Sequence, residues 1–105
     1  LGSVRAETAY QIRRLRHHAC LALWCGNNEI EDMPNEINKT PERKRAFEDL
    51  FYGVIPEEVK KHDPSRSYWP CSPHNVDGWD KPRNREGAGD VHDWSVWHGR
   101  RRAET

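Results

Sequence analysis

"ACLALWCGNNEIED", residues 19–32, joins an apolar run directly to a cluster of amides and acids. Residues 19–25 are apolar without alternation, which is typical of a strand buried on both faces of a parallel sheet. Polar side chains that follow such a strand lie at the carboxyl edge of the sheet, where α/β folds place their sites. The stretch therefore predicts a buried strand followed by the edge of a functional cleft.

The polar end of this stretch contains a candidate acid, Glu29. We expect Gly26 to permit an unusual backbone turn after the strand and so to present Asn27, Asn28 and Glu29 to the cleft. A carboxyl group close to the apolar Trp24 and to a hydrogen-bonding amide is well placed for a raised pKa. Such a group can act as a general acid, whereas a solvated loop acid is the ordinary alternative.

Helical patterns lie on both sides of the predicted strand. Residues 3–18, SVRAETAYQIRRLRHH, place apolar side chains near helical spacing and arginines on the other faces, which predicts an amphipathic helix. In residues 40–54, TPERKRAFEDLFYGV, Thr40 can cap a helix, Pro41 fits its first position, and apolar residues recur at helical spacing. Residues 56–62 predict another short helix.

The rest of the chain shows strand and loop patterns. Residues 67–73, SYWPCSP, predict a short strand that two prolines end. Residues 74–90 are rich in Gly, Pro, Asn and Asp and predict a long loop, a feature that is often functional in a compact domain. Residues 91–99, VHDWSVWHG, predict a third short strand or its exit loop. Helices and strands in this order indicate an α/β fold with a parallel sheet.

The bulk composition limits the size of the core and the class of partner. The 105 residues suit one small domain, and 34% hydrophobic against 32% charged residues leaves little material for a large core. Lys and Arg number 17, as do Asp and Glu, so neither nucleic acid nor a membrane surface is expected as a partner. The basic residues 100–102 are expected to be solvated surface. The odd number of cysteines, 3, predicts no disulfide framework and favours a reducing compartment.

A metal site is the obvious rival interpretation of the Cys and His residues. The candidate ligands are Cys20, Cys25, Cys71, His74, His92 and His98. Their spacings match no paired zinc pattern, so we expect no metal and no other cofactor. A thiol nucleophile made of Cys71 and a histidine is a further alternative that the sequence does not favour. Of the tryptophans, Trp24 is expected to pack in the core, and the pattern does not decide the role of Trp79.

Three segments carry a family resemblance. They are HHACLALWCGNNEIE (17–31), DPSRSYWPCSP (63–73) and GDVHDWSVWHG (89–99), in this order and at these intervals. Together they closely resemble the catalytic barrel of the β-mannosidases of glycoside hydrolase family 2, over residues 12–99. The resemblance implies that residues 1–105 are part of a (β/α)8 TIM barrel, about strands four to six with their helices. The chain would then be a partial glycoside hydrolase catalytic domain, with residues 74–90 as a long loop.

The resemblance also assigns roles to individual residues. It implies that Glu29, at the end of the fourth strand, is the acid/base of a reaction that hydrolyses terminal non-reducing β-D-mannose residues with retention. Asn28 would hydrogen-bond the 2-hydroxyl of the sugar. The expected lining of the mannose pocket is Trp69, Trp94, Trp97 and His98. Indoles suit the C–H faces of a sugar, while amides, imidazoles and carboxylates bind its hydroxyls.

The same resemblance places the nucleophile on a later strand, the seventh, outside this sequence. A retaining glycosidase needs two carboxylates, so a chain that carries the acid/base without the nucleophile is not expected to complete the reaction by itself. The alternative is a non-catalytic barrel remnant that self-associates, docks to the missing remainder of the barrel, or binds carbohydrate. Exposed strand edges and an uncovered apolar face would drive such association. The expected small-molecule partner is a β-mannoside oligosaccharide.

Overall fold

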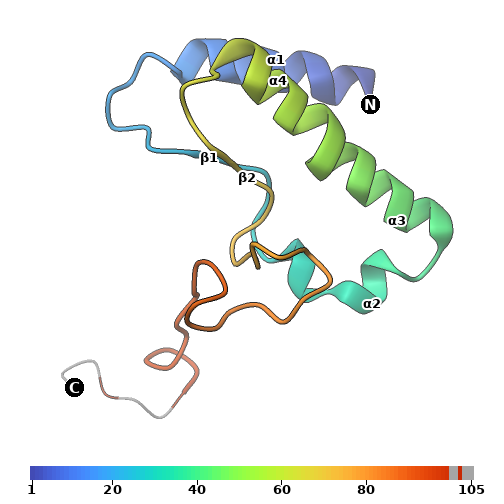
Figure 1. Ribbon diagram of the computed structural model, residues 1–105, viewed down its shortest axis with the longest axis vertical. Coiled ribbons are helices and arrows are strands. Elements are labelled where there is room, and N and C mark those ends of the chain that lie inside the picture. Colours follow the sequence, from blue (N-terminus) through green and yellow to red (C-terminus); the bar gives the residue numbers. More distant parts are fainter. Residues whose placement is uncertain (100–101, 103–105) are drawn as a thin grey trace.

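A computed structural model describes residues 1–99 and 102, so Arg100 and Arg101 of the basic cluster lie outside the described residues. The molecule is flat, with principal extents of 44 × 40 × 22 Å, and two short strands run between a helical side and an irregular side (Figure 1). The α-helices are α1 (Gly2–Leu15), α2 (Pro34–Ile37), α3 (Pro41–Glu48) and α4 (Ile55–His62). A 3₁₀-helix spans Ile30–Asp32, a π-helix spans Asp49–Val54, and the strands are β1 (Trp24–Cys25) and β2 (Tyr68–Trp69).

α1 packs beside α4 (Figure 1). Ala9 and Ile12 are the buried residues of α1, and Val59 is buried on α4. Arg5 adds an ion pair with Glu58 at 2.6 Å, and this hydrogen-bonded guanidinium holds the pKa of Glu58 below its usual range. The amphipathic helix predicted near the N-terminus is therefore confirmed, with its apolar stripe facing another helix.

α1 ends at Leu15, earlier than predicted, because Arg66 binds the chain beyond it. The Arg66 guanidinium donates to three carbonyl oxygens on this turn, those of Arg16 (2.7 Å), His18 (3.1 Å) and Leu21 (2.6 Å). These carbonyl oxygens accept hydrogen bonds from the guanidinium, so they need no N–H partner from a further helical turn. The predicted extension of the helix through residue 18 is therefore wrong.

β1 and β2 form a parallel pair, with Trp24 opposite Tyr68 and Cys25 opposite Trp69. This confirms the parallel sheet predicted from the order of the elements. The predicted strand of residues 19–25 is wrong in length and in burial, because only its last two residues form a strand and most of the others are exposed. Among the described residues β1 has a strand neighbour on one side alone, so it is not buried as a central strand would be.

α3, the π-helix and α4 run as one continuous rod (Figure 1). Thr40 caps the rod as predicted, since its Oγ1 accepts a hydrogen bond of 3.2 Å from the N–H of Arg43, and Pro41 holds the first helical position. The apolar face predicted for residues 40–54 buries Phe47 and Val54. The helix predicted for residues 56–62 also forms, but it continues the first helix without interruption.

The π-helix explains how the rod passes Pro56, which has no N–H and whose ring would crowd an ordinary helical turn. The N–H of Ile55 donates to the carbonyl of Leu50, five residues back, and this widens the turn. The carbonyl of Phe51, released from the helical ladder, accepts a hydrogen bond of 2.7 Å from the Tyr68 hydroxyl. This bond ties the rod to β2, directly beside the candidate site.

Residues 74–99 contain neither helix nor strand, apart from an isolated bridge between Asn75 and Gly89. Of the two alternatives predicted for residues 91–99, the third strand does not form and the loop does. The loop has a turn closed by a 2.8 Å hydrogen bond from the N–H of His98 to the carbonyl of Trp94. Across the described residues, no helix has the length and apolar character needed to cross a membrane.

Candidate functional site

Glu29 follows β1 and begins the 3₁₀-helix with left-handed backbone angles, φ 61° and ψ 8°. Its N–H donates to the carbonyl of Ser72 at 2.9 Å, which continues the pairing of the two strands. The unusual backbone turn was predicted at Gly26, but it occurs at Glu29. Gly26 is required for a different reason, because a Cβ there would collide with the Tyr68 hydroxyl and the Pro70 carbonyl oxygen.

The Glu29 carboxylate is held by two N–H donors from the C-terminal loop. His92 Nδ1 lies 2.9 Å from Glu29 Oε1, and the Trp94 indole N–H donates to the same oxygen at 3.3 Å. These hydrogen bonds, from His92 first and then Trp94, hold the pKa of Glu29 below its usual range. The raised pKa predicted from the sequence is wrong, because His92 and Trp94 donate hydrogen bonds that favour the ionised carboxylate.

Behind His92, the contacts continue into the wall of a cavity. His92 Nε2 lies 2.8 Å from Ser72 Oγ, and the Ser72 hydroxyl donates to Asp90 Oδ2. Asp90 Oδ1 accepts from the Trp69 indole at 3.0 Å and from the N–H of His74 at 2.9 Å. Burial alone would raise the pKa of Asp90, but the bonds from Ser72, His74 and Trp69 together outweigh it and lower that pKa.

A cavity of about 460 Å³ lies against this network. Trp69, Ser72 and Asp90 form one part of its lining, and Leu23, Cys25 and Gly89 form the rest. Its wall thus combines an indole and apolar side chains with a carboxylate and a hydroxyl. Apolar surface with a few placed polar groups is the usual composition of a small-molecule site.

The predicted site residues differ in how close they lie to Glu29. Asn28 is exposed beside Glu29, and its side-chain hydrogen bond also helps to lower the pKa of Glu29. Trp94 is 50% exposed, and its ring lies 5.2 Å from that of His98. Trp97 is 79% exposed and is not part of the cavity lining. Glu29, Asn28 and Trp94 therefore come together, His98 joins through Trp94, and Trp97 stands apart.

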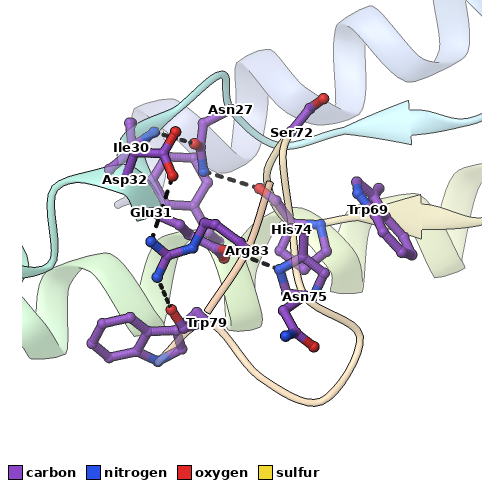
Figure 2. Close-up of polar contacts among 12 residues, drawn as sticks. Asn27, Ile30, Glu31, Asp32, Trp69, Ser72, His74, Asn75, Trp79 and Arg83 are labelled. Carbon is purple, nitrogen blue, oxygen red and sulfur yellow. Dashed lines mark hydrogen bonds and ion pairs between the residues drawn. The ribbon is translucent and has the colours of Figure 1, made fainter. Parts of the chain in front are cut away.

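Side-chain contacts fasten the segment 27–32, which carries Glu29, to the segment 69–83 (Figure 2). Glu31 is fully buried and accepts hydrogen bonds from the Tyr52 hydroxyl at 2.5 Å and from His74 Nδ1 at 2.7 Å. Burial and this carboxylate hold the pKa of Tyr52 well above its usual range. Glu31 thereby links the rod, the Glu29 segment and the long loop.

Two further contacts between the segments, and one within the segment 27–32, complete this attachment (Figure 2). Asn27 Nδ2 donates to the Pro70 carbonyl at 2.9 Å, and Asn27 Oδ1 accepts from the N–H of Ile30 at 3.1 Å. Arg83, whose side chain is 10% exposed, lies 3.5 Å from Asp32. The contacts of Asn27, Glu31 and Asp32 thus hold the segment that carries Glu29 in place.

Sequence reasoning did not identify His92, Ser72, Asp90 or Glu31 as parts of the site. His92 and Asp90 lie in the motif GDVHDWSVWHG, and Ser72 lies in DPSRSYWPCSP, so the segments were recognised without the roles of these residues.

In the described part of the chain, no group of three or more His, Cys, Asp and Glu side chains is arranged to hold a metal ion. Cys20 and Cys25 are exposed and Cys71 is buried, all as free thiols.

No protein-family model matches the chain. The curated relatives that it matches include β-mannosidase B of Aspergillus clavatus and of Emericella nidulans, each 37% identical, and that of Aspergillus niger, 34% identical. Each alignment covers 94% of this chain but 13% of the relative. Among solved structures, the β-D-mannosidase of Dictyoglomus thermophilum matches with a TM-score of 0.73 and 34% identity, over 93% of this chain and 12% of that chain.

The chain thus spans a small part of the length of the proteins that it matches. Within that part the alignments cover 93–94% of this chain, and the similarity holds both in sequence, at 34–37% identity, and in the arrangement of helices and strands. The resemblance to β-mannosidases that the three motifs indicated is therefore confirmed, in sequence and in fold, over the part of those proteins that this chain spans.

Proposed function

We propose that the chain is a segment of a glycoside hydrolase catalytic domain that removes terminal non-reducing β-D-mannose from oligosaccharides with retention of configuration. In this proposal residues 1–105 supply about strands four to six of a (β/α)8 barrel of family 2, and residues 74–90 are a long loop beside the site. Glu29 is the acid/base, and Asn28 binds the 2-hydroxyl. The remaining proposed sugar contacts are Trp69, Trp94, Trp97 and His98.

The observation that carries this proposal is the position of Glu29. Its carboxylate lies at the end of a parallel strand and accepts hydrogen bonds from His92 and Trp94. His92 connects it through Ser72 to the wall of a cavity that contains Trp69. In α/β folds the carboxyl ends of strands hold the reactive groups, and an indole wall suits the apolar face of a sugar.

A retaining reaction needs a second carboxylate as nucleophile, roughly 5 Å from the first. The relatives are far longer than this chain, which covers 13% of the first curated relative. We assign the nucleophile to a part of such proteins that has no counterpart in these 105 residues. The segment then contributes the acid/base and part of the mannose pocket.

The direct test is hydrolysis of two substrates by the 105-residue chain combined with the remainder of a homologous barrel, either as a chimera or as separate chains. The substrates are 4-nitrophenyl β-D-mannopyranoside, which has a good leaving group, and a β-mannoside oligosaccharide, which has a poor one. We expect turnover that Glu29→Gln abolishes on substrates with poor leaving groups, because these need protonation of the leaving oxygen. Glu36→Gln is a matched control on an exposed helix. Equal turnover by the Glu29→Gln variant would refute the acid/base role.

A second candidate function is that of a non-catalytic remnant that self-associates or binds carbohydrate. The observation in its favour is the pair of short strands, which lack further strand neighbours in the described chain. Light scattering coupled to chromatography tests it, because association through these edges gives a mass above 12.3 kDa. A sharp monomer peak with cooperative unfolding would exclude self-association.

A further inference from the structure

A line of four polar side chains leads from the candidate acid into the cavity wall. His92 Nδ1 lies 2.9 Å from Glu29 Oε1, and His92 Nε2 lies 2.8 Å from Ser72 Oγ. The Ser72 hydroxyl in turn donates to Asp90. We call these four residues the Glu29–Asp90 network. None of the roles assigned from the motifs includes His92, Ser72 or Asp90.

The number of hydrogens in this network is informative. Its three contacts each require one hydrogen. An ionised carboxylate supplies none, whereas a neutral imidazole and a hydroxyl supply one each. With Glu29 and Asp90 ionised and His92 neutral, two hydrogens serve three contacts. One additional proton is needed to complete the network.

The surroundings indicate which group holds that proton. Glu29 also accepts from the Trp94 indole, and Asp90 also accepts from the Trp69 indole and the N–H of His74. Such N–H donors favour the ionised form of each carboxylate. Imidazole is in general a stronger base than a carboxylate by roughly two pKa units. The imidazole of His92, which faces an oxygen at each ring nitrogen, is therefore the best place for the proton.

We propose that the Glu29–Asp90 network stores one proton on His92, and that His92 is the positioning residue that fixes Glu29 through Oε1 and supplies it with that proton. The inference rests on the proposed acid/base role of Glu29 and deepens it. With the proton on His92, Glu29 is a carboxylate in the resting chain. Glu29 becomes a carboxylate again once it has given this proton to the leaving oxygen, and in that form it activates the water of the second half, whose proton restores the store on His92.

The first half of such a reaction needs the protonated form of Glu29. Transfer of the stored proton meets this need: the bond from His92 Nδ1 to hydrogen breaks, a bond to Glu29 Oε1 forms, and the nitrogen keeps the electron pair. A neutral imidazole and a carboxylic acid result, and no proton is taken from water. The two groups are already within hydrogen-bond distance, so no rearrangement of the loop is required.

The indole N–H groups provide built-in reporters for a test on the 105-residue chain. Trp94 donates to Glu29, Trp69 donates to Asp90, and Trp24 donates to Asp63 in a separate part of the molecule. In a ¹⁵N-labelled chain, the pH dependence of each indole signal follows its own carboxylate. The ring nitrogens of His92 are observed in the same sample.

At about pH 7 we expect both ring nitrogens of His92 to carry hydrogen, as the hydrogen count requires. In His92→Asn an amide N–H can still reach Glu29, but the stored proton and its charge are lost. The midpoint of the Trp94 titration should then rise by on the order of one pH unit, a tenfold gain in proton affinity. The Trp24 midpoint should not move. Ser72→Ala should shift the Trp94 midpoint in the same direction by less.

Two results would overturn the inference. One is a His92 ring with a single hydrogen at about pH 7 while Glu29 is ionised. The other is an unchanged Trp94 midpoint in both His92→Asn and His92→Gln, with the Trp24 indole signal in its native position as evidence of folding. The titration needs no turnover, so a chain that passes it but supports no mannoside hydrolysis would refute the proposed function and leave the network intact.

Discussion

The helical half of the molecule, made of α1 and the rod of residues 41–62, is built differently from the loop half, residues 69–99. The helical half buries mainly apolar side chains, among them Ile12, Phe47 and Val59, together with one carboxylate, Glu58, that is paired with Arg5. In the loop half the buried residues include polar ones, and hydrogen bonds to Asp90 and Glu31 set the course of the chain. Much of the candidate site lies in this loop half, and Glu29 is bound to it by hydrogen bonds from His92 and Trp94.

The comparison predicts that losing one buried polar group damages this molecule more than losing an exposed one of the same type. Glu31→Ala removes the acceptor of both the Tyr52 hydroxyl and His74 Nδ1. Because both donors are left without that partner, we expect a loss of about 3–5 kcal/mol in the free energy of unfolding. Urea denaturation followed by tryptophan fluorescence measures it.

Glu36→Ala is the matched control, since Glu36 is exposed and pairs with Arg43 on the helix surface. It should cost less than about 1 kcal/mol. Similar urea midpoints for the two variants would mean that Glu31 does not hold the loop half in place.

The junction of the two halves gives the next largest effect. Gly26→Ala adds a methyl group where the Tyr68 hydroxyl and the Pro70 carbonyl leave no room, and we expect a cost of about 1–3 kcal/mol. Gly53→Ala has an open site in the rod, with the nearest atom at 3.9 Å, and should stabilise the chain by about 0.5–1 kcal/mol. Thermal unfolding of both variants tests the pair, and destabilisation by Gly53→Ala with tolerance of Gly26→Ala would contradict it.

The same contrast explains what the sequence could and could not predict. Helical spacing and the Thr40 cap predicted α1 and α3, because periodic burial and capping leave a local pattern. The early end of α1 was not predictable from local residues, since it depends on Arg66, fifty residues away from Arg16. The uninterrupted rod also depends on a distant group, the Tyr68 hydroxyl.

The candidate site shows the same limit. Glu29 was found because it follows an apolar run and lies in a recognised motif. The direction of its pKa shift was not predicted correctly, because His92 and Trp94 lie more than sixty residues further along the chain. A residue's type and neighbours in sequence indicate that it is functional, whereas its acid strength depends on which donors the fold brings to it.

A smaller effect is expected at the start of the rod. Thr40→Ala removes the acceptor for the N–H of Arg43 and should cost about 1 kcal/mol. Thr40→Ser keeps an acceptor oxygen and should cost less. Circular dichroism during thermal unfolding measures both. If the loop half melts earlier in Thr40→Ala while the rod does not, the two halves are more strongly coupled than the comparison implies.

The smallest expected effect is local and appears in acid. The pKa values of Glu29 and Asp90 are below their usual range, so their contribution to stability is present above the unfolded values near about 4 and is lost as the pH falls through the folded pKa values. The Trp69 indole N–H, bound to Asp90, should therefore exchange faster with solvent below about pH 4, after correction for the intrinsic rate. The backbone amide of Ile12, in the helical half, should keep its protection from hydrogen exchange.

Asp90→Asn separates this effect from general acid unfolding. The variant lacks the titrating group, so the Trp69 indole should be less protected at neutral pH and should show little further change in acid. If protection is instead lost together at Trp69 and Ile12, the two halves unfold as one cooperative unit. The polar contacts would then stabilise the helices as well as the site, because a single unit transmits the loss of any carboxylate to all of its parts.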